Sequence, residues 1–391
     1  MKTAESRSTF AASILREGAG RGARAELFAA QAVSRASVLF CTLSSAGQAI
    51  FSDAPAPDAL VVDEAAQALE SELVVAFARR PRRCLLVGDP AQLPATMHSE
   101  PARRAGHDRS LMRRMLDVAR KEHGGAPEWY TLLDTQYRMH PAIASFPSER
   151  FYGGGLVNHP SVSRRRVAVA GSSPGSGSVP GWIRAPFVFV DVTSGLEERG
   201  GGGRSSGGPS TSASVGNDAE ASLAASLAAS LPRVVLADGD VDDAAPAAAV
   251  ITFYAEQARR VRREFANSAS LVNSLRASTR ANATAGAVRA DAPAAPGVHS
   301  VDSFQGSEAE VVVVSAVRRN PGRDVGFLAD PRRLNVALTR AKRLCVVLGC
   351  ASTLEGSASE DLRALVVDAR ERGVLVPEAE VRAWIETLRT R

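Results

Sequence analysis

Short apolar runs alternate along the chain with longer stretches whose apolar residues recur at helical spacing. In the first third of the chain these runs cover residues 37–42, 59–62 and 84–87, are rich in Val and Leu, and end in polar turns. Apolar runs of this kind between helical stretches are typical of buried parallel strands in an α/β layer. The stretch 70–79, between the last two runs, is predicted to be a crossover helix.

The rest of the chain repeats this pattern. Further strands are predicted at 129–133, 187–192, 248–253, 297–301, 310–317 and 344–348. A helix is predicted over 218–231, because Leu223, Leu227 and Leu231 recur at every fourth residue on one face. Asn217 is a suitable cap for its first turn, and Pro232 is expected to stop it.

Two consecutive α/β units follow from this order, with a doubly wound architecture. We expect residues 1–129 to belong to the first unit, 130–375 to the second and 376–391 to a C-terminal helix. The second unit is interrupted by Gly/Ser-rich and Ala-rich stretches near 171–216 and 267–296, which are predicted to be surface insertions.

Composition argues against two classes of protein. No apolar run approaches the ~20 residues needed to span a bilayer, and the N-terminus has no secretion signal, so neither a membrane protein nor a secreted one is expected. The four cysteines form no CxxC pair and are interpreted as reduced core residues rather than zinc ligands. A net charge of +5 permits a nucleic-acid partner without demonstrating one.

Adjacent carboxylates end one of the predicted strands. Residues 60–67 read LVVDEAAQ, which places Asp63 and Glu64 at the carboxyl end of the strand, where open parallel sheets bind ligands. There Asp63 would hold Mg²⁺, directly or through water, and Glu64 would orient and deprotonate an attacking water. The alternative is an ordinary junction between strand and loop that happens to be acidic.

The next strand ends in GDPAQLP, residues 88–94, at the same edge of the predicted sheet. Gln92 in this position can donate to a γ-phosphate and accept from a water, and so sense whether the phosphate is present. The heptapeptide is too long and too unusual in composition to be expected by chance. Together the two motifs favour a nucleotide-hydrolysing site.

Three later motifs extend the pattern: QYRMHP at 136–141, VDSFQGSE at 301–308 and RLNVALTRAK at 333–342. In this order, the five motifs resemble superfamily 1 nucleic-acid helicases of the branch that contains senataxin and the nonsense-mediated-decay helicase. The resemblance covers about residues 35–375. Segments around 146–153, 191–195 and 326–328 are most similar to the senataxin group.

The resemblance implies two RecA-like domains of the P-loop NTPase fold, which close and open around ATP. Arg138 and Arg340 match the family's arginine fingers, and a permanently charged, fork-shaped guanidinium suits phosphate oxygens. Gly306 would approach the γ-phosphate and Glu308 the ribose. In the motif at 251–257, Tyr254 matches the adenine-stacking aromatic and Gln257 a further ATP-binding residue; the alternative for Tyr254 is a core aromatic at a strand end.

Contacts with a nucleic-acid strand are implied for Thr42 in the first domain and, more weakly, for Ser303 in the second. Backbone contacts of this kind give affinity without much sequence selectivity. A hydroxyl after a strand is equally often an ordinary turn or cap. The basic run 164–166 is interpreted as a solvated charge run, with a basic contact to the strand or part of an import signal as the alternatives.

A phosphate-cradling loop, GxxxxGK[ST], is expected ahead of the Asp-Glu motif, and the sequence has none. Its only lysines, Lys2, Lys121 and Lys342, do not follow glycine loops. We therefore expect Met1 to fall partway through the first motor domain, which would be incomplete and would expose sheet edge and apolar surface. This chain alone is expected to bind ATP weakly and to hydrolyse it at or near background.

The leading hypothesis is a fragment of an ATP-dependent helicase or translocase. By resemblance it would use ATP and Mg²⁺ and move 5′→3′ on single-stranded RNA or DNA, with RNA–DNA hybrids as a further substrate. The alternative is a catalytically inactive, helicase-derived nucleic-acid-binding or scaffold protein. A different nucleotide switch would not explain the paired arginine motifs. We expect a nuclear or cytoplasmic protein, with the nucleus favoured, and no membrane partner; the sequence identifies no protein partner.

Overall fold

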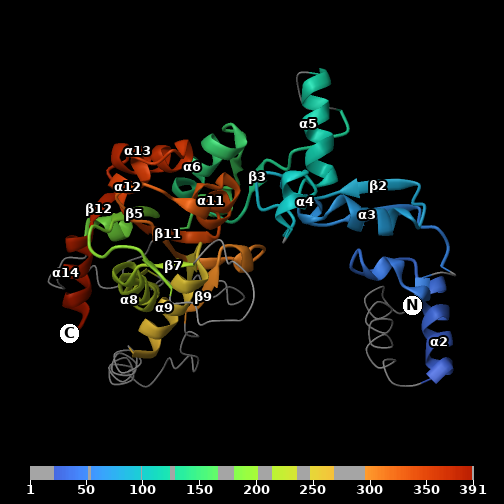
Figure 1. Ribbon diagram of the computed structural model, residues 1–391, viewed down its shortest axis with the longest axis horizontal. Helices are drawn as coiled ribbons and strands as arrows, with labels where there is room; N and C mark the ends of the chain where they lie inside the picture. Colours follow the sequence, from blue (N-terminus) through green and yellow to red (C-terminus); the bar gives the residue numbers. More distant parts are fainter. Residues whose placement is uncertain are drawn as a thin grey trace. The chain divides into compact units, whose positions relative to one another are not determined.

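The chain divides into two compact units, residues 1–131 and 132–391, drawn in Figure 1. The computed structural model describes residues 22–51, 54–97, 99–123, 128–165, 180–200, 214–235, 247–267 and 296–389. Parallel strands flanked by helices occur in both units, so the predicted α/β class is confirmed. Of the insertions predicted near 171–216 and 267–296, residues 171–179, 201–213 and 268–295 lie outside the described residues, whereas 180–200 and 214–216 are described and include the core strand Phe187–Asp191.

The first unit contains a parallel pair of strands, β1 (Ala59–Val62) and β2 (Arg83–Leu86), joined by the predicted crossover helix α3 (Glu70–Phe77). One face of the pair buries Val62 against Ala65 and Leu73. The remaining elements of this unit are α2 (Gly22–Arg35), η2 (Ser45–Gly47), η3 (Ala49–Phe51), η4 (Ala65–Gln67), α4 (Glu100–Arg104) and α5 (Leu111–His123).

The opposite face of this strand pair carries exposed apolar side chains. Val61 and Leu85 lie opposite each other in the ladder and are 61% and 58% exposed. The strand predicted at 37–42 is wrong, and Phe40 within it is largely exposed. An apolar run becomes a strand only beside a partner that satisfies its amides and carbonyls, and none of the described strands pairs with this one. Cys41 and Cys84 are exposed as well, which corrects their interpretation as core residues.

The second unit is built on six parallel strands in the order β12-β5-β11-β10-β8-β9. Their bounds are β5 (Phe187–Asp191), β8 (Ala248–Thr252), β9 (Gly297–Ser300), β10 (Ala309–Ser315), β11 (Ala341–Gly349) and β12 (Leu375–Pro377). The two-residue strands are β3 (Thr135–Gln136) with β4 (Val157–Asn158), and β6 (Glu198–Arg199) with β7 (Val215–Gly216). The strand predicted at 129–133 is wrong, because the chain becomes extended and paired only at β3.

Helices cover this sheet and bury its apolar side chains. They are α6 (Pro141–Tyr152), α7 (Pro160–Ser163), η5 (Gly181–Arg184), α8 (Asp218–Val235), α9 (Ala255–Asn267), η6 (Asp302–Phe304), η7 (Gly326–Ala329), α11 (Pro331–Leu338), α12 (Ala351–Glu355), α13 (Glu360–Glu371) and α14 (Glu378–Arg389). Leu223, Leu227 and Leu231 of α8 are fully buried, as their spacing predicts. The Asn217 cap is confirmed, since its Oδ1 accepts from Glu220 N at 3.2 Å. Pro232 does not stop the helix, and the prediction is wrong there: α8 continues to Val235, although a proline inside a helix costs one hydrogen bond and crowds the carbonyl four residues before it.

Because all six strands run the same way, the sheet has two functionally different edges. We call them the amino edge, where the strands begin, and the carboxyl edge, where they end. Glu308 and Arg340 lie at the amino edge, directly before β10 and β11. Tyr254 lies at the carboxyl edge, after β8. Among the described helices, none combines the length and the apolar composition that crossing a membrane requires.

Candidate functional site

The Asp-Glu and GDPAQLP motifs of the first unit lie side by side. Ala65 N donates to Val87 O at 2.7 Å, and Val87 N donates to Val62 O at 2.8 Å, which continues the ladder past the ends of β1 and β2. A Cβ on Gly88 would lie 2.8 Å from Ala66 N, closer than side chains allow, so only glycine fits there. The sequence therefore brings the two motifs together as predicted.

Asp63 and Glu64 both lie exposed in the turn after β1. Glu64 adopts a left-handed conformation with φ +52°, which is unfavourable for a residue with a Cβ and is found preferentially at functional sites. Its amide donates to Asp63 Oδ1 at 3.0 Å, and its Oε2 accepts from Gln67 Nε2 at 2.6 Å. These bonds fix the direction of both carboxylates.

Asp89 orders the GDPAQLP loop. Its Oδ1 accepts from Ala91 N at 2.9 Å and its Oδ2 from Gln92 Nε2 at 2.8 Å. The side chain of Gln92 is thereby held on the loop next to the Asp-Glu turn.

Asp63 fits the role of a magnesium ligand. Among the described residues, no group of three or more His, Cys, Asp or Glu side chains is arranged to hold a metal ion by itself. Mg²⁺ commonly uses one or two carboxylates and takes its other ligands from water and phosphate oxygens. A single exposed carboxylate at the end of a strand is consistent with this mode of Mg²⁺ coordination.

Arg138, Glu308 and Lys342 form an ion cluster at the amino edge of the second unit. Glu308 Oε2 accepts from Arg138 Nε at 2.5 Å, and Glu308 Oε1 lies 2.8 Å from Lys342 Nζ. Burial works to raise the pKa of Glu308, but hydrogen bonds from Lys342 and Arg138 outweigh it and hold the pKa below its ordinary value. About a third of the side-chain surface of both Arg138 and Glu308 is exposed, so solvent reaches the cluster.

The turn that carries Arg138 is held on three sides. Gln136 Oε1 accepts from the amides of Arg138 and Met139 at 3.0 and 2.8 Å, and His140 N donates to Lys342 O at 2.8 Å. Arg165 donates through its guanidinium to the carbonyls of Tyr137 and Arg138. Arg165 is therefore part of the scaffold, and interpreting it as one of a solvated charge run was wrong.

The structure does not bring Arg340 to the surface. Arg340 is only 2% exposed, and its guanidinium donates to Val336 O at 3.0 Å and to Thr339 Oγ1 at 2.9 Å. Arg138 Nη1 donates to Thr339 O at 3.4 Å, so both arginines meet at Thr339. Gly306, with φ +79° and nothing within 4 Å of a Cβ, lies in the turn that precedes Glu308.

Neither Tyr254 nor Gln257 is presented to a nucleotide. Both are buried, and they follow β8 at the carboxyl edge, whereas Arg138 and Glu308 lie at the amino edge. Tyr254 donates through its hydroxyl to Val325 O at 3.0 Å, and Gln257 bonds Asn217 N and O through its amide group. Their polar groups are engaged inside the unit, which corrects the expectation that they bind ATP and agrees with the alternative of a core aromatic.

Tyr137, an aromatic residue that the sequence motifs did not mark as a site residue, precedes Arg138 in the chain. Tyr137 is 59% exposed, and its ring lies 4.4 Å from that of His159, measured between ring centroids. The available signal was an aromatic residue inside QYRMHP, adjacent to the expected arginine finger. An exposed ring that is backed on one side is suited to stacking against a base.

Thr42 and Ser303 both lie in turns that their own hydroxyls stabilise. Thr42 Oγ1 accepts from Ser45 N at 3.2 Å and donates to Ser45 Oγ at 2.9 Å. Ser303 Oγ donates to Ser300 O at 3.1 Å. The structure places these hydroxyls in local turns and shows them exposed, so a contact with a strand remains a proposal.

Parallel α/β units with these strand-end motifs define the RecA-like class. Two family profiles, each described as an AAA domain, match residues 107–352 and 4–100. Helicase SEN1 of Saccharomyces cerevisiae is 32% identical over 320 residues, which are 81% of this chain and 12% of that protein. The probable helicase MAGATAMA 3 of Arabidopsis thaliana is 30% identical over 83% of this chain and 34% of its own length.

DNA-binding protein SMUBP-2 of Rattus norvegicus is 33% identical over 336 residues, 85% of this chain and 28% of that protein. The chain belongs to the superfamily 1 helicases of the group that includes senataxin and SEN1. It spans about a third or less of the length of these relatives.

Proposed function

We propose that this chain is part of an ATP-dependent helicase or translocase that moves 5′→3′ on single-stranded RNA or DNA. The observation that carries the proposal is the cluster of Arg138, Glu308 and Lys342. It places a guanidinium, permanently charged and partly exposed, beside a carboxylate at one edge of a parallel sheet. Support also comes from the family, whose relatives include proteins described as helicases and as a DNA-binding protein.

In the first unit, Asp63 would hold Mg²⁺, directly or through water, and the ion would supply positive charge to the phosphates. Glu64, turned outward by its left-handed backbone, orients the attacking water and accepts its proton. Gln92, fixed by Asp89, contacts that water and the γ-phosphate. Each role uses a side chain that the ends of β1 and β2 already bring to one place.

In the second unit, Arg138 supplies positive charge to the transferring phosphoryl group. A phosphate competes with Glu308 for the guanidinium, and Lys342 keeps Glu308 neutralised when Arg138 turns away. Arg340 donates to the hydroxyl of Thr339 inside the unit. For Arg340 to contact a phosphate, the segment that contains Thr339 and Arg340 has to move. Tyr137 would stack its ring on the base of the nucleotide, Gly306 would approach the γ-phosphate, and Glu308 would contact the ribose.

The experiment is an ATPase assay of this chain with and without homopolymer RNA and DNA, alongside Glu64→Gln and Arg138→Ala. The printed sequence contains no GxxxxGK[ST], and we expect a rate at or near background together with measurable strand binding. A strand-stimulated rate that Glu64→Gln abolishes would overturn the expectation of weak hydrolysis. If the chain binds neither strand nor nucleotide, the proposed function itself fails.

A catalytically inactive nucleic-acid-binding or scaffold protein is the second candidate. The burial of Arg340 favours it. Reading the transcript upstream of Met1 separates the two. An in-frame GxxxxGK[ST] after an apolar strand supports the motor, and abundant transcripts that start translation at Met1 support the binding protein.

A further inference from the structure

Phe327 is an exposed aromatic residue held between two buried neighbours. It lies in η7 (Gly326–Ala329) and is 48% exposed, whereas Val325 and Leu328 are buried. The neighbouring side chains anchor the turn inside the unit and leave the Phe327 ring at the surface. The ring is thereby available to a partner at a fixed position on the surface of the unit.

The ring lies at the carboxyl edge of the sheet, where β8 and β9 end. The ring centroid of Tyr254, which follows β8, lies 6.2 Å from that of Phe327. The Arg333 guanidinium lies 5.4 Å from the Phe327 ring centre, and it also bonds Asp302 Oδ1, after β9, at 3.1 Å. Phe327 is therefore connected through Arg333 to the turn that contains Ser303.

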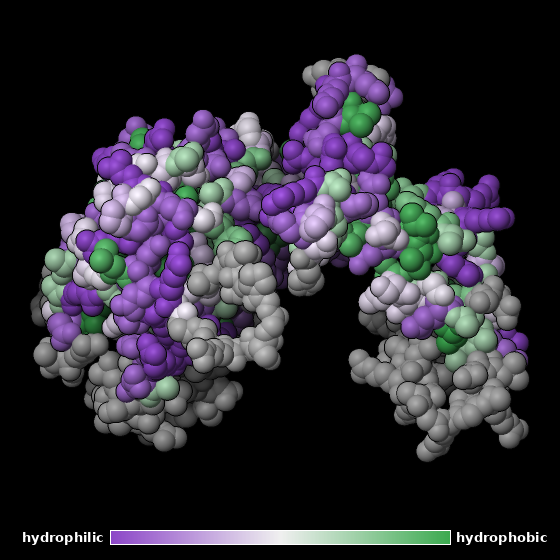
Figure 2. All heavy atoms as spheres, viewed as in Figure 1, coloured by the Kyte–Doolittle hydropathy of each residue, from purple (hydrophilic) through white to green (hydrophobic). Residues whose placement is uncertain are grey.

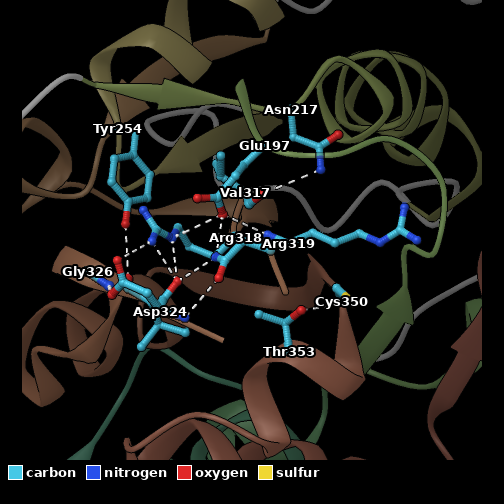
Figure 3. A network of polar contacts seen from close by, with 12 residues as sticks. Glu197, Asn217, Tyr254, Val317, Arg318, Arg319, Asp324, Gly326, Cys350 and Thr353 are labelled. Atoms are coloured by element: carbon cyan, nitrogen blue, oxygen red, sulfur yellow. Dashed lines mark hydrogen bonds and ion pairs between the residues drawn. The ribbon is translucent and has the colours of Figure 1, made fainter. Parts of the chain in front are cut away.

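Arg318 holds the turn before Phe327 in place through hydrogen bonds to Asp324 (Figure 3). The side chain of Arg318 is almost completely buried. Its guanidinium donates to Asp324 O at 2.8 and 2.6 Å and to Asp324 Oδ2 at 2.8 Å. Gly326 has φ +49°, and a Cβ there would lie 3.2 Å from the Tyr254 hydroxyl, so the turn packs closely on Tyr254.

Hydrogen bonds also fix the start of the segment 317–327. Val317 has φ +71°, which a β-branched residue adopts only under strain. Glu220 Oε2 accepts from Val317 N at 2.8 Å and from Ser315 Oγ at 2.7 Å, and it holds the strained residue in place. Glu197 Oε2 accepts from Arg319 N at 3.0 Å (Figure 3). Ordering this segment therefore costs little when a ligand binds.

We propose that Phe327, backed by Arg333, stacks against a base of a single nucleic-acid strand that crosses the carboxyl edge of the second unit. The inference rests on the proposed function and adds to it a contact with a base. Every base has a π-face, so a fixed aromatic ring binds all four with little selectivity. Arg319 and Arg323, on the same segment, add positive charge for the phosphates.

The test is fluorescence anisotropy with labelled 15-nucleotide oligo-U RNA and oligo-dT DNA on the full chain. We expect Phe327→Ala to weaken binding by about 5- to 100-fold, and Phe327→Trp to retain it. Val157→Ala is the control, because it removes another exposed apolar side chain of the same unit, on β4, which pairs with β3 and not with the segment that contains Phe327. Melting curves establish that the variants are folded.

A strand with abasic sites separates stacking from a general loss of structure. We expect the parent chain and Phe327→Ala to bind that strand equally, because no base is present to stack. If Phe327→Ala weakens binding to the abasic strand as much as to the intact one, stacking is overturned. If the parent binds strands and Phe327→Ala binds them equally well, the ring serves another contact, such as one with a protein, and the inference fails. If the parent binds no strand at all, it is the proposed function that fails.

Discussion

Arg138 donates to Glu308 at 2.5 Å although the two residues are 170 positions apart in the chain. The same carboxylate accepts from Lys342, whose side chain is almost completely buried. A buried cation that loses its partner carries a large desolvation cost, so this cluster supports the fold as well as the proposed chemistry.

Glu308→Gln is expected to lower the free energy of unfolding by about 1–3 kcal/mol, because the buried Lys342 ammonium then loses the carboxylate at 2.8 Å and keeps that of Glu310 at 4.0 Å. Urea unfolding measures the change. Asp117→Asn is the control, since its partners Arg109 and Arg113 are more exposed than Lys342 and Arg138, and such pairs are worth about 0–1 kcal/mol. Equal effects of the two substitutions would show that the cluster is not stabilising.

Gly88→Ala tests the close approach of the two motif loops. The added methyl would lie 2.8 Å from Ala66 N and 3.0 Å from Ala65 N, which are backbone atoms that move only with the whole turn. We expect a loss of about 1–3 kcal/mol in the stability of the first unit. Gly181→Ala has space around it and is expected to change stability by less than about 0.5 kcal/mol. A neutral Gly88→Ala would mean that the loops do not approach so closely.

Glu220 makes the second unit sensitive to pH. Burial raises its pKa to about 7, against hydrogen bonds from Ser315 and Val317 that lower it, and the charges of Glu378 and Glu197 raise it further. The fold thus favours the protonated form. This contribution to stability is fully present below the ordinary pKa of 4.5 and is lost as the pH rises through about 7.

Glu220→Gln keeps an oxygen acceptor for Val317 and has no charge to bury. We expect the variant to be more stable than the parent above about pH 8, by on the order of 3 kcal/mol, with the difference disappearing below the ordinary pKa of 4.5. Thermal unfolding across this range measures it. Glu380→Gln, at an exposed position of α14, controls for the loss of one negative charge. A constant difference at every pH would contradict the titration of Glu220.

Tyr137→Ala tests the base platform beside Arg138. We expect the affinity for a fluorescent ATP analogue to fall by roughly 3- to 30-fold, and Tyr137→Phe to behave as the parent, because stacking uses the ring and not the hydroxyl. Tripolyphosphate, which has no base, should compete equally well with both variants. An equal loss of tripolyphosphate binding in Tyr137→Ala would indicate damage to the Arg138 turn instead.

The predicted strands succeeded where both faces of a strand are buried. The apolar residues of β10 and β11 form continuous runs, since each strand lies between two others under layers of helices. The run 37–42 has similar composition and failed, because composition does not state whether a partner strand is present. Val61 and Leu85, on the exposed face of β1 and β2, are a second example, because their apolar character does not show whether another element covers that face. Figure 2 shows the apolar residues on the surface in view in green.

At the candidate site, the motifs predicted which residues follow which strand, and the ladder past β1 and β2 brings Asp63 and Gln92 to one edge as expected. They did not predict which way a side chain turns. Gln257 faces inward because Asn217, 40 residues away, takes both ends of its amide, and Arg165 is a scaffold residue because of carbonyls 27 and 28 residues away. Contacts between residues so far apart in the chain cannot be predicted from the spacing of residues within one segment.

The parallel sheet of the second unit separates Glu308 from Val317 by the length of β10, which has seven residues and spans about 23 Å. One end of this strand carries the groups proposed for the nucleotide, and the other begins the segment that ends at Phe327. With a hydrogen-bonded strand on either side, β10 has both of its edges paired. The length of this strand therefore sets the separation between the end proposed for the nucleotide and the end proposed for the base contact.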